Sequence, residues 1–152
     1  MRRRLAVWSV VWGACAAGCG GTGPAPLSVG REACAFCRMT VSQPDFASQI
    51  VEAGELPKLF DDLGCLNQFL TATPPGSDTA VIYVTDRRTK EWVRAGSAVF
   101  SRVDALSTPM SSHLVAHASD ASRDADPEAA GGVPVPVADV VPAAWRAPGG
   151  GY

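Results

Sequence analysis

The chain has 152 residues, enough for one ordinary domain, and its 47% hydrophobic and 18% charged residues are typical of a globular protein. These proportions exclude a largely disordered chain, which has too few apolar side chains to offset the entropy of folding. The formal net charge of -2 excludes nucleic acid as the partner, because binding nucleic acid needs a basic face that displaces counterions.

The first 18 residues have the pattern of a bacterial lipoprotein signal peptide. Three arginines at positions 2–4 precede an apolar run over residues 5–17, which is shorter than the ~20 residues that span a bilayer. The run ends in small residues before Cys19, so we predict cleavage there and acylation of the Cys19 side chain. A plain signal peptide that is cut nearby is the alternative. We therefore expect an exported protein, lipid-anchored to a bacterial membrane and facing the periplasm, with the outer membrane as the default.

Residues 19–30 are rich in glycine and proline and are predicted to be a flexible tether between the lipid and the folded part. The folded domain is expected over residues 31–146, and residues 147–152 are expected to be a loose tail. The cysteines of this domain are Cys34, Cys37 and Cys65. Because three thiols cannot form a closed set of disulfides in an oxidising compartment, at least one of them has another use.

The segment Cys34-Ala35-Phe36-Cys37-Arg38-Met39 is a CxxCxM motif at the end of the tether. Two cysteines separated by two residues can place both sulfurs on one ion, and the Met39 thioether can reach the same ion. Soft sulfur ligands select Cu(I) over harder divalent metals. The motif therefore predicts a Cu(I) site.

Other chemistries use a CxxC motif as well. A c-type haem site needs histidine directly after the second cysteine, where this chain has Arg38. A thiol-redox protein carries the motif at a helix start, whereas here it follows a tether and precedes β-type residues. Structural zinc needs four ligands, and the three cysteines with one histidine could supply them. A plain disulfide between Cys34 and Cys37 is the simplest alternative.

A strand is predicted over residues 46–53, followed by a helix that starts at Asp61 or Asp62 and runs to about Leu70. Both aspartates are better explained as helix caps than as a catalytic carboxylate pair. Cys65 lies in the first turns of this helix. It is interpreted first as a small buried thiol, and second as a possible metal ligand whose pKa the helix start lowers.

Residues 80–85 form a continuous apolar run that predicts a central strand buried on both faces. Residues 92–103 predict further strand, or strand plus a short helix. A short strand is expected over residues 114–118, and a helix is expected over residues 119–130, ended by two glycines. Residues 133–140 contain two prolines, which suits an edge strand.

Met110, in the segment Thr108-Pro109-Met110, is a second candidate thioether ligand. Most methionines fill cores, but Met39 and Met110 both lie at element boundaries beside cysteine or proline. His113 and His117 share one face of the following strand, since residues of equal parity do. Solvent-facing side chains are the default for both histidines, and a transient copper contact is the alternative.

The order of elements repeats weakly along the chain. A methionine, a strand, a helix and a strand occur once from Met39 onward and again from Met110 onward. The fold class predicted from this repeat is α+β, with two similar ββαβ-like units in one small domain and possible halves at residues 31–88 and 89–146. Each half would then present a methionine at the equivalent edge.

Six segments of the chain resemble the NosL family, the lipoprotein accessory factors of nitrous oxide reductase. They are CAFCRMTVSQPDFASQI, LFDDLGCLNQF, YVTD, WVRAGSAVF, TPM and the late AAGG, which occur in this order. The resemblance implies a copper chaperone, not an enzyme, with Cys34, Cys37, Met39 and Met110 as candidate ligands. The implied partners are nitrous oxide reductase and its membrane maturation complex, together with membrane lipid through acylated Cys19.

Overall fold

The computed structural model describes residues 23–146. The predicted signal peptide, the lipidated Cys19 and the tail at 147–152 lie outside these residues. The strands are β1 (Ser48–Val51), β2 (Lys58–Phe60), β3 (Val81–Thr85), β4 (Trp92–Arg94), β5 (Val99–Arg102), β6 (Leu114–His117) and β7 (Val133–Val135). The α-helices are α1 (Leu63–Ala72), α2 (Asp120–Asp124) and α3 (Val137–Val140). Short 3₁₀ helices occur at Pro44–Phe46, Ala95–Ser97, Pro127–Ala129 and Ala143–Arg146.

The strands form two antiparallel sheets with the same internal order. The first has the order β2-β1-β3-β4, and the second has the order β6-β5-β7. In each unit the first strand lies between the second and the third, and a helix separates the second strand from the third along the chain. The predicted fold class, α+β with two similar ββαβ units, is confirmed.

The two methionines, however, do not occupy equivalent places in these units. Met39 precedes β1, the first strand of its unit, whereas Met110 lies between β5 and β6, the first and second strands of the other unit. The repeat is therefore one of strand order and not of methionine position. In addition, β4 pairs with β3, so the first sheet extends beyond residue 88.

In the first unit β1, α1 and β3 lie where the sequence predicts them, whereas β2 was not predicted. Every residue of β3 is buried, as expected for a strand between β1 and β4 that is covered on both faces. Helix α1 begins after Asp62, whose carboxylate accepts the Gly64 N–H as an N-cap. Its buried residues are Leu63, Cys65, Leu66 and Leu70. Residues 92–103 give β4, a 3₁₀ turn and β5, which confirms the prediction of strand plus a short helix.

Two predictions for the second unit are wrong in part. The helix expected over residues 119–130 is only α2 and a separate 3₁₀ turn, because Pro127 has no N–H with which to continue the helix. The extended segment expected over residues 133–140 is a strand only to Val135, on the predicted sheet edge, and helix α3 follows Pro136. Proline favours a helix start because its fixed φ suits the first turn.

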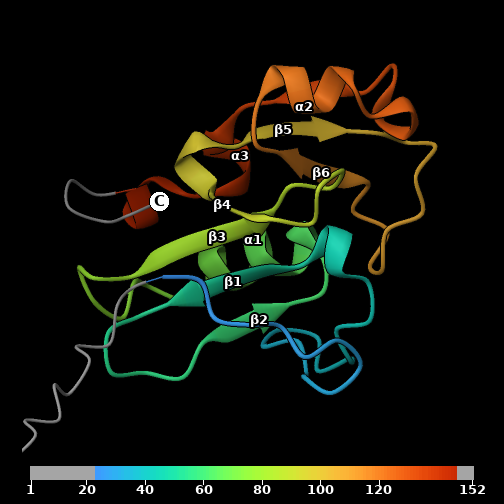
Figure 1. Cartoon of the computed structure of the whole chain (residues 1–152). Coiled ribbons are helices and arrows are strands. Elements are labelled where there is room, and N and C mark those ends of the chain that lie inside the picture. The colour runs from blue at the N-terminus through green and yellow to red at the C-terminus, as the bar shows by residue number, and fades with distance from the viewer. Residues whose placement is uncertain (1–22, 147–152) are drawn as a thin grey trace, which may run out of the picture.

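Figure 1 shows the second sheet above the first, with α2 over the outer side of the second sheet. Phe100 and Ala116 of the second sheet belong to the same core as α1 and the first sheet. Val103 and Val115 pack on the other side of the second sheet. A continuous core thus joins the two units and fixes their loops relative to one another. Among residues 23–146, no helix has the length and apolar character needed to cross a membrane.

The end of the predicted tether contacts the first sheet. The buried Gln49 side chain accepts the Ala25 N–H at 2.9 Å and donates to the Ala25 carbonyl at 3.1 Å. The Gly30 N–H donates to the Val41 carbonyl at 2.8 Å. Contacts with the domain therefore begin before Arg31, and the chain enters the CxxC segment from a defined place.

Candidate metal centre

The CxxC motif forms a closed turn that is fastened to the first sheet. The Cys34 N–H donates to the Met39 carbonyl at 2.7 Å, and the Arg38 N–H donates to the Cys34 carbonyl at 3.1 Å. Arg38 adopts a left-handed conformation, with φ of 69°, which helps to reverse the chain. The Ala35 N–H donates to the Leu59 carbonyl of β2 at 2.7 Å, so the turn has a fixed position on the edge of the sheet. This turn does not open a helix, which separates it from the thiol-redox arrangement.

Strand β2 and the start of helix α1 supply the opposite side of the site. Asp61 follows Phe60, the last residue of β2, and Asp62 is the N-cap of α1. Cys65 is the third residue of the helix and is buried. The cap therefore sets the direction of the first helical turn, and with it the place of the Cys65 thiol.

Three thiols and one carboxylate meet between the turn and the helix. The sulfurs of Cys34, Cys37 and Cys65 and a carboxylate oxygen of Asp61 all lie within 4.8 Å of one another. The Cys37 thiol donates to the two Asp61 oxygens, at 3.5 and 3.7 Å. Cys34 and Cys65 are fully buried, and Cys37 is partly exposed. This group could hold one metal ion, with Cys37 at its open side.

The surroundings of the two buried thiols, Cys34 and Cys65, favour their protonated form. Burial raises the pKa of the Cys34 thiol, and the hydrogen bond with Asp61 adds to the effect. Burial also raises the pKa of Cys65, and the nearby Cys34 and Asp61 raise it further because they would bring negative charge to the same place. The expectation that the helix start lowers the pKa of Cys65 is therefore wrong. A bound cation would relieve the repulsion between these groups when they are ionised.

Met39 and Met110 approach this cluster through their backbones. The Met39 carbonyl accepts the Cys34 N–H, as described above, and the Met110 N–H donates to the Asp62 carboxylate at 2.9 Å. Their side chains are 56% and 40% exposed, respectively, so neither methionine is a core residue. Both remain candidate ligands that could reach an ion from the outside of the cluster.

The two histidines have other partners. His117 is fully buried, and its Nε2 lies 3.0 Å from a carboxylate oxygen of Asp126, which also accepts from Arg87 at 2.6 Å. The expectation of a solvent-facing side chain is wrong for His117, because both faces of β6 are covered. The Nδ1 atom of the partly buried His113 lies 2.7 Å from the Leu106 carbonyl. Neither histidine belongs to the group of thiols and carboxylate.

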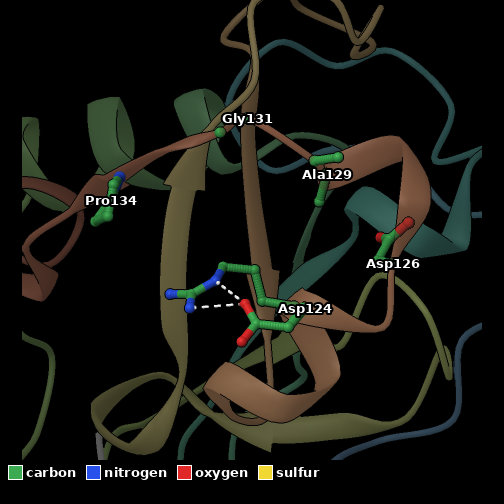
Figure 2. A pocket seen from close by; sticks show the side chains of 8 residues that line it. Asp124, Asp126, Ala129, Gly131 and Pro134 are labelled. Atoms are coloured by element: carbon green, nitrogen blue, oxygen red, sulfur yellow. Dashed lines mark hydrogen bonds and ion pairs between the residues drawn. The ribbon is translucent and has the colours of Figure 1, made fainter.

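A cavity of about 380 Å³ lies apart from the cluster, beside the second sheet, and Figure 2 shows its lining side chains. Its charged lining residues are Arg123, Asp124 and Asp126. Arg123 pairs with Asp124, as the dashed lines in Figure 2 show, and Asp126 pairs with the buried Arg87. Because these charges already have partners, the cavity offers no comparable set of ligands.

Asp61 is the member of the cluster that sequence reasoning missed, since it was interpreted as a cap. The structure assigns the cap to Asp62 and leaves the Asp61 carboxylate next to Cys37. The signal that could have identified it is its position directly before the N-cap of the helix that carries Cys65.

The family model described as NosL matches residues 26–145 of the chain. This span includes all four residues of the cluster and both methionines. No curated protein and no solved structure matches the chain.

Proposed function

This chain belongs to the NosL family, whose members are copper-associated accessory proteins and not enzymes, and on that premise we propose that it is a Cu(I) carrier for the maturation of nitrous oxide reductase. The observation that supports this proposal most directly is the convergence of Cys34, Cys37 and Cys65 within 4.8 Å, together with Asp61. These three thiols come from two separate segments of the chain, and the fold brings them together. They are the softest ligands that a protein offers.

The donor set suits a monovalent soft ion. Thiolate and thioether sulfur favour Cu(I), whereas carboxylate oxygen suits harder divalent ions. We propose that two or three of the thiols bind Cu(I) and that Met39 and Met110 contribute from the exposed side. A site of low coordination number leaves a position open, so a partner can add a ligand before the first donors leave. Copper then passes by ligand exchange and is never released as a free ion.

The surface around the turn supports such a transfer. The large exposed hydrophobic residues of the described chain are Val29, Phe36, Met39, Leu56, Met110 and Val133. Of these, Phe36 and Met39 lie in the CxxCxM segment, and Val29 lies shortly before it. Leu56, which is 86% exposed, lines a groove of about 430 Å³ together with Ala35 and Arg38 of the turn. Clustered apolar exposure is typical of protein interaction sites.

The proposed partners are nitrous oxide reductase and the membrane complex that matures it. The proposed location is the periplasmic face of a membrane, with acylated Cys19 as the anchor. The lipoprotein pattern before Cys19 and the family support both proposals. Attachment to a membrane would confine the search for a membrane-bound partner to two dimensions.

Competition of the reduced protein with a Cu(I) chelator tests the carrier function. We expect one tightly bound Cu(I) per chain, and we expect Cys37→Ser and Cys65→Ser to weaken binding by at least about tenfold. Asp104→Asn is the control, because the Asp104 side chain is exposed and paired with Arg102, so this variant should bind copper as the parent does. Copper-loaded protein should then restore copper to metal-free nitrous oxide reductase. Copper binding that does not depend on the cluster cysteines would refute the proposal.

A structural zinc site is the second candidate function, and the Asp61 carboxylate is the observation that favours it. Three cysteines and one carboxylate make a four-donor set, which is the number that structural zinc requires. This set replaces the cysteine–histidine set considered from the sequence. A zinc-stabilised module would lose its fold on removal of zinc, whereas a carrier must be folded when empty. Circular dichroism of the metal-free, reduced protein separates the two.

A further inference from the structure

The hydrogen bond between Met110 and Asp62 joins a loop of the second unit to the cap of the helix that carries Cys65. The Asp62 carboxylate accepts the Gly64 N–H with Oδ1 at 2.6 Å and the Met110 N–H with Oδ2 at 2.9 Å. We propose that Asp62 is a positioning residue for copper binding, which places the Met110 thioether at the mouth of the thiol cluster by holding the Met110 backbone. This inference rests on the proposed function, because it takes Cu(I) as the ion that Met110 meets.

The place of Asp62 in the chain makes it suited to this role. Its neighbour Asp61 belongs to the cluster, and Cys65 follows three residues later on the helix that Asp62 caps. A group bonded to Asp62 is therefore held beside two members of the cluster. Within residues 105–112, Met110 is the residue whose backbone N–H donates to the Asp62 carboxylate.

A second contact holds the same loop against the helix. A Cβ atom added at Gly64 would lie 2.8 Å from the Ser112 Cβ, closer than real Cβ atoms approach. The loop thus rests directly on the first turn of α1, and Gly64 leaves the space for it. Contacts on both sides of Met110, at Asp62 and at Ser112, define where this residue stands relative to the helix.

The loop itself is held by its own hydrogen bonds. The Thr108 carbonyl accepts the Ser111 N–H at 3.0 Å, and the Thr108 hydroxyl accepts the His113 N–H at 3.2 Å. Ser111 and His113 both adopt left-handed conformations, with φ of 56° and 59°. Because residues 108–113 are hydrogen-bonded to one another, the bond from Met110 to Asp62 holds this whole loop in place.

The choice of aspartate fits this double use. A helix cap needs one oxygen, and serine, asparagine and aspartate cap with similar strength. The second oxygen of Asp62 is fully buried with the first and finds its donor in Met110. A carboxylate is the smallest capping side chain with two acceptor oxygens, so it can cap α1 and hold Met110 at the same time.

Two substitutions separate these roles. Asp62→Asn and Asp62→Ser both keep a capping oxygen, but asparagine turns an amide donor toward the Met110 N–H and serine has no second oxygen. We expect each to weaken Cu(I) binding by about 10–100-fold in competition with bicinchoninate, the range typical of losing a group that orients a metal ligand. Met110→Leu should weaken binding by the same factor. Combining it with Asp62→Asn should cause no further loss, because both changes remove one contribution.

Ser119→Ala is the matched control. It removes the N-cap of α2 in the second unit, so it should lower stability and leave the Cu(I) affinity unchanged. Full parental affinity in Asp62→Asn and Asp62→Ser, or losses that add to that of Met110→Leu, would overturn the inference. A parent protein without tight Cu(I) binding would instead overturn the proposed function, and the two failures are therefore distinct.

Discussion

The Cys37 thiol lies 3.5 Å from a carboxylate oxygen of Asp61. The cluster therefore combines one hard oxygen ligand with three soft sulfur ligands. The two kinds of donor prefer different ions. Zn²⁺ accepts carboxylate oxygen as a ligand, whereas Cu(I) binds sulfur in preference to oxygen. Asp61 therefore affects which metal the site retains.

Asp61→Asn should shift the preference of the site toward Cu(I). The amide keeps the size of the side chain and removes its charge, so we expect Zn²⁺ affinity to fall by at least about tenfold and Cu(I) affinity by less than about threefold. Competition titrations with a chelator for each ion measure both values. Asp104→Asn is the control for loss of a negative charge, since the Asp104 side chain is on the surface. Equal losses for both ions would show that Asp61 does not discriminate between them.

Cu(I) binding should strengthen as the pH rises from 6 to 8. Burial raises the pKa of Cys34 and of Cys65, so both thiols carry protons in this range and must lose them to become ligands. Each thiol that binds as a thiolate should add about one decade of affinity per pH unit. Chelator competition at several pH values measures how steeply the Cu(I) affinity rises with pH. Cys65→Ser should lower this slope by about one decade per pH unit. A slope of zero would contradict thiolate ligation by these residues.

The sequence predicts most of the fold, because the relevant signals are local. Periodicity and capping located α1, the continuous apolar run located β3, and the order of elements indicated the repeated unit. The breaks at Pro127 and Pro136 were missed, although proline is itself the signal that a regular element ends there.

The site was predicted only in part for a different reason. The turn with Cys34 and Cys37 is local and has a recognisable spacing. The meeting of this turn with Asp61 and Cys65 depends on its docking against β2, through the hydrogen bond from Ala35 to Leu59. Long-range contacts of this kind leave no periodic pattern in the sequence. The burial of His117 is another such case, because its partner Asp126 lies beyond α2.

Asp126→Asn should destabilise the fold and leave the metal site intact. The Asp126 carboxylate pairs with the buried Arg87 at 2.6 Å and with His117 at 3.0 Å, so its loss leaves the Arg87 charge with less compensation. Removing one partner of a buried pair costs about 3–5 kcal/mol. Urea unfolding measures this loss, and Asp104→Asn, in a surface pair, should cost less than about 1 kcal/mol. The Cu(I) affinity of the folded variant at neutral pH should equal that of the parent. A large change in affinity would show that the ion pairs of Asp126 affect the metal site.

Asp86 should make the stability of the metal-free protein depend on pH in the acid range. Burial alone would raise the pKa of Asp86, but hydrogen bonds from the Ser122 hydroxyl and from backbone N–H groups lower it from 3.8 to about 2. Because the folded-state pKa lies below the unfolded one, the stabilisation is present above about pH 4 and is lost as the pH falls toward 2. A shift of this size corresponds to about 2 kcal/mol.

The free energy of unfolding, measured with urea from pH 5 to pH 2, should therefore fall by about 2 kcal/mol less in Asp86→Asn than in the parent. Ser122→Ala should lie between them, since it removes the donor at 2.6 Å and keeps the bond from the Ala118 N–H at 2.8 Å. The pKa of the Asp126 carboxylate is also lowered, so Asp126 contributes to the same pH dependence. Because Asp126 is present in all three proteins, its contribution cancels when they are compared. Parallel pH profiles for Asp86→Asn and the parent would mean that the hydrogen bonds to Asp86 do not favour its charged form.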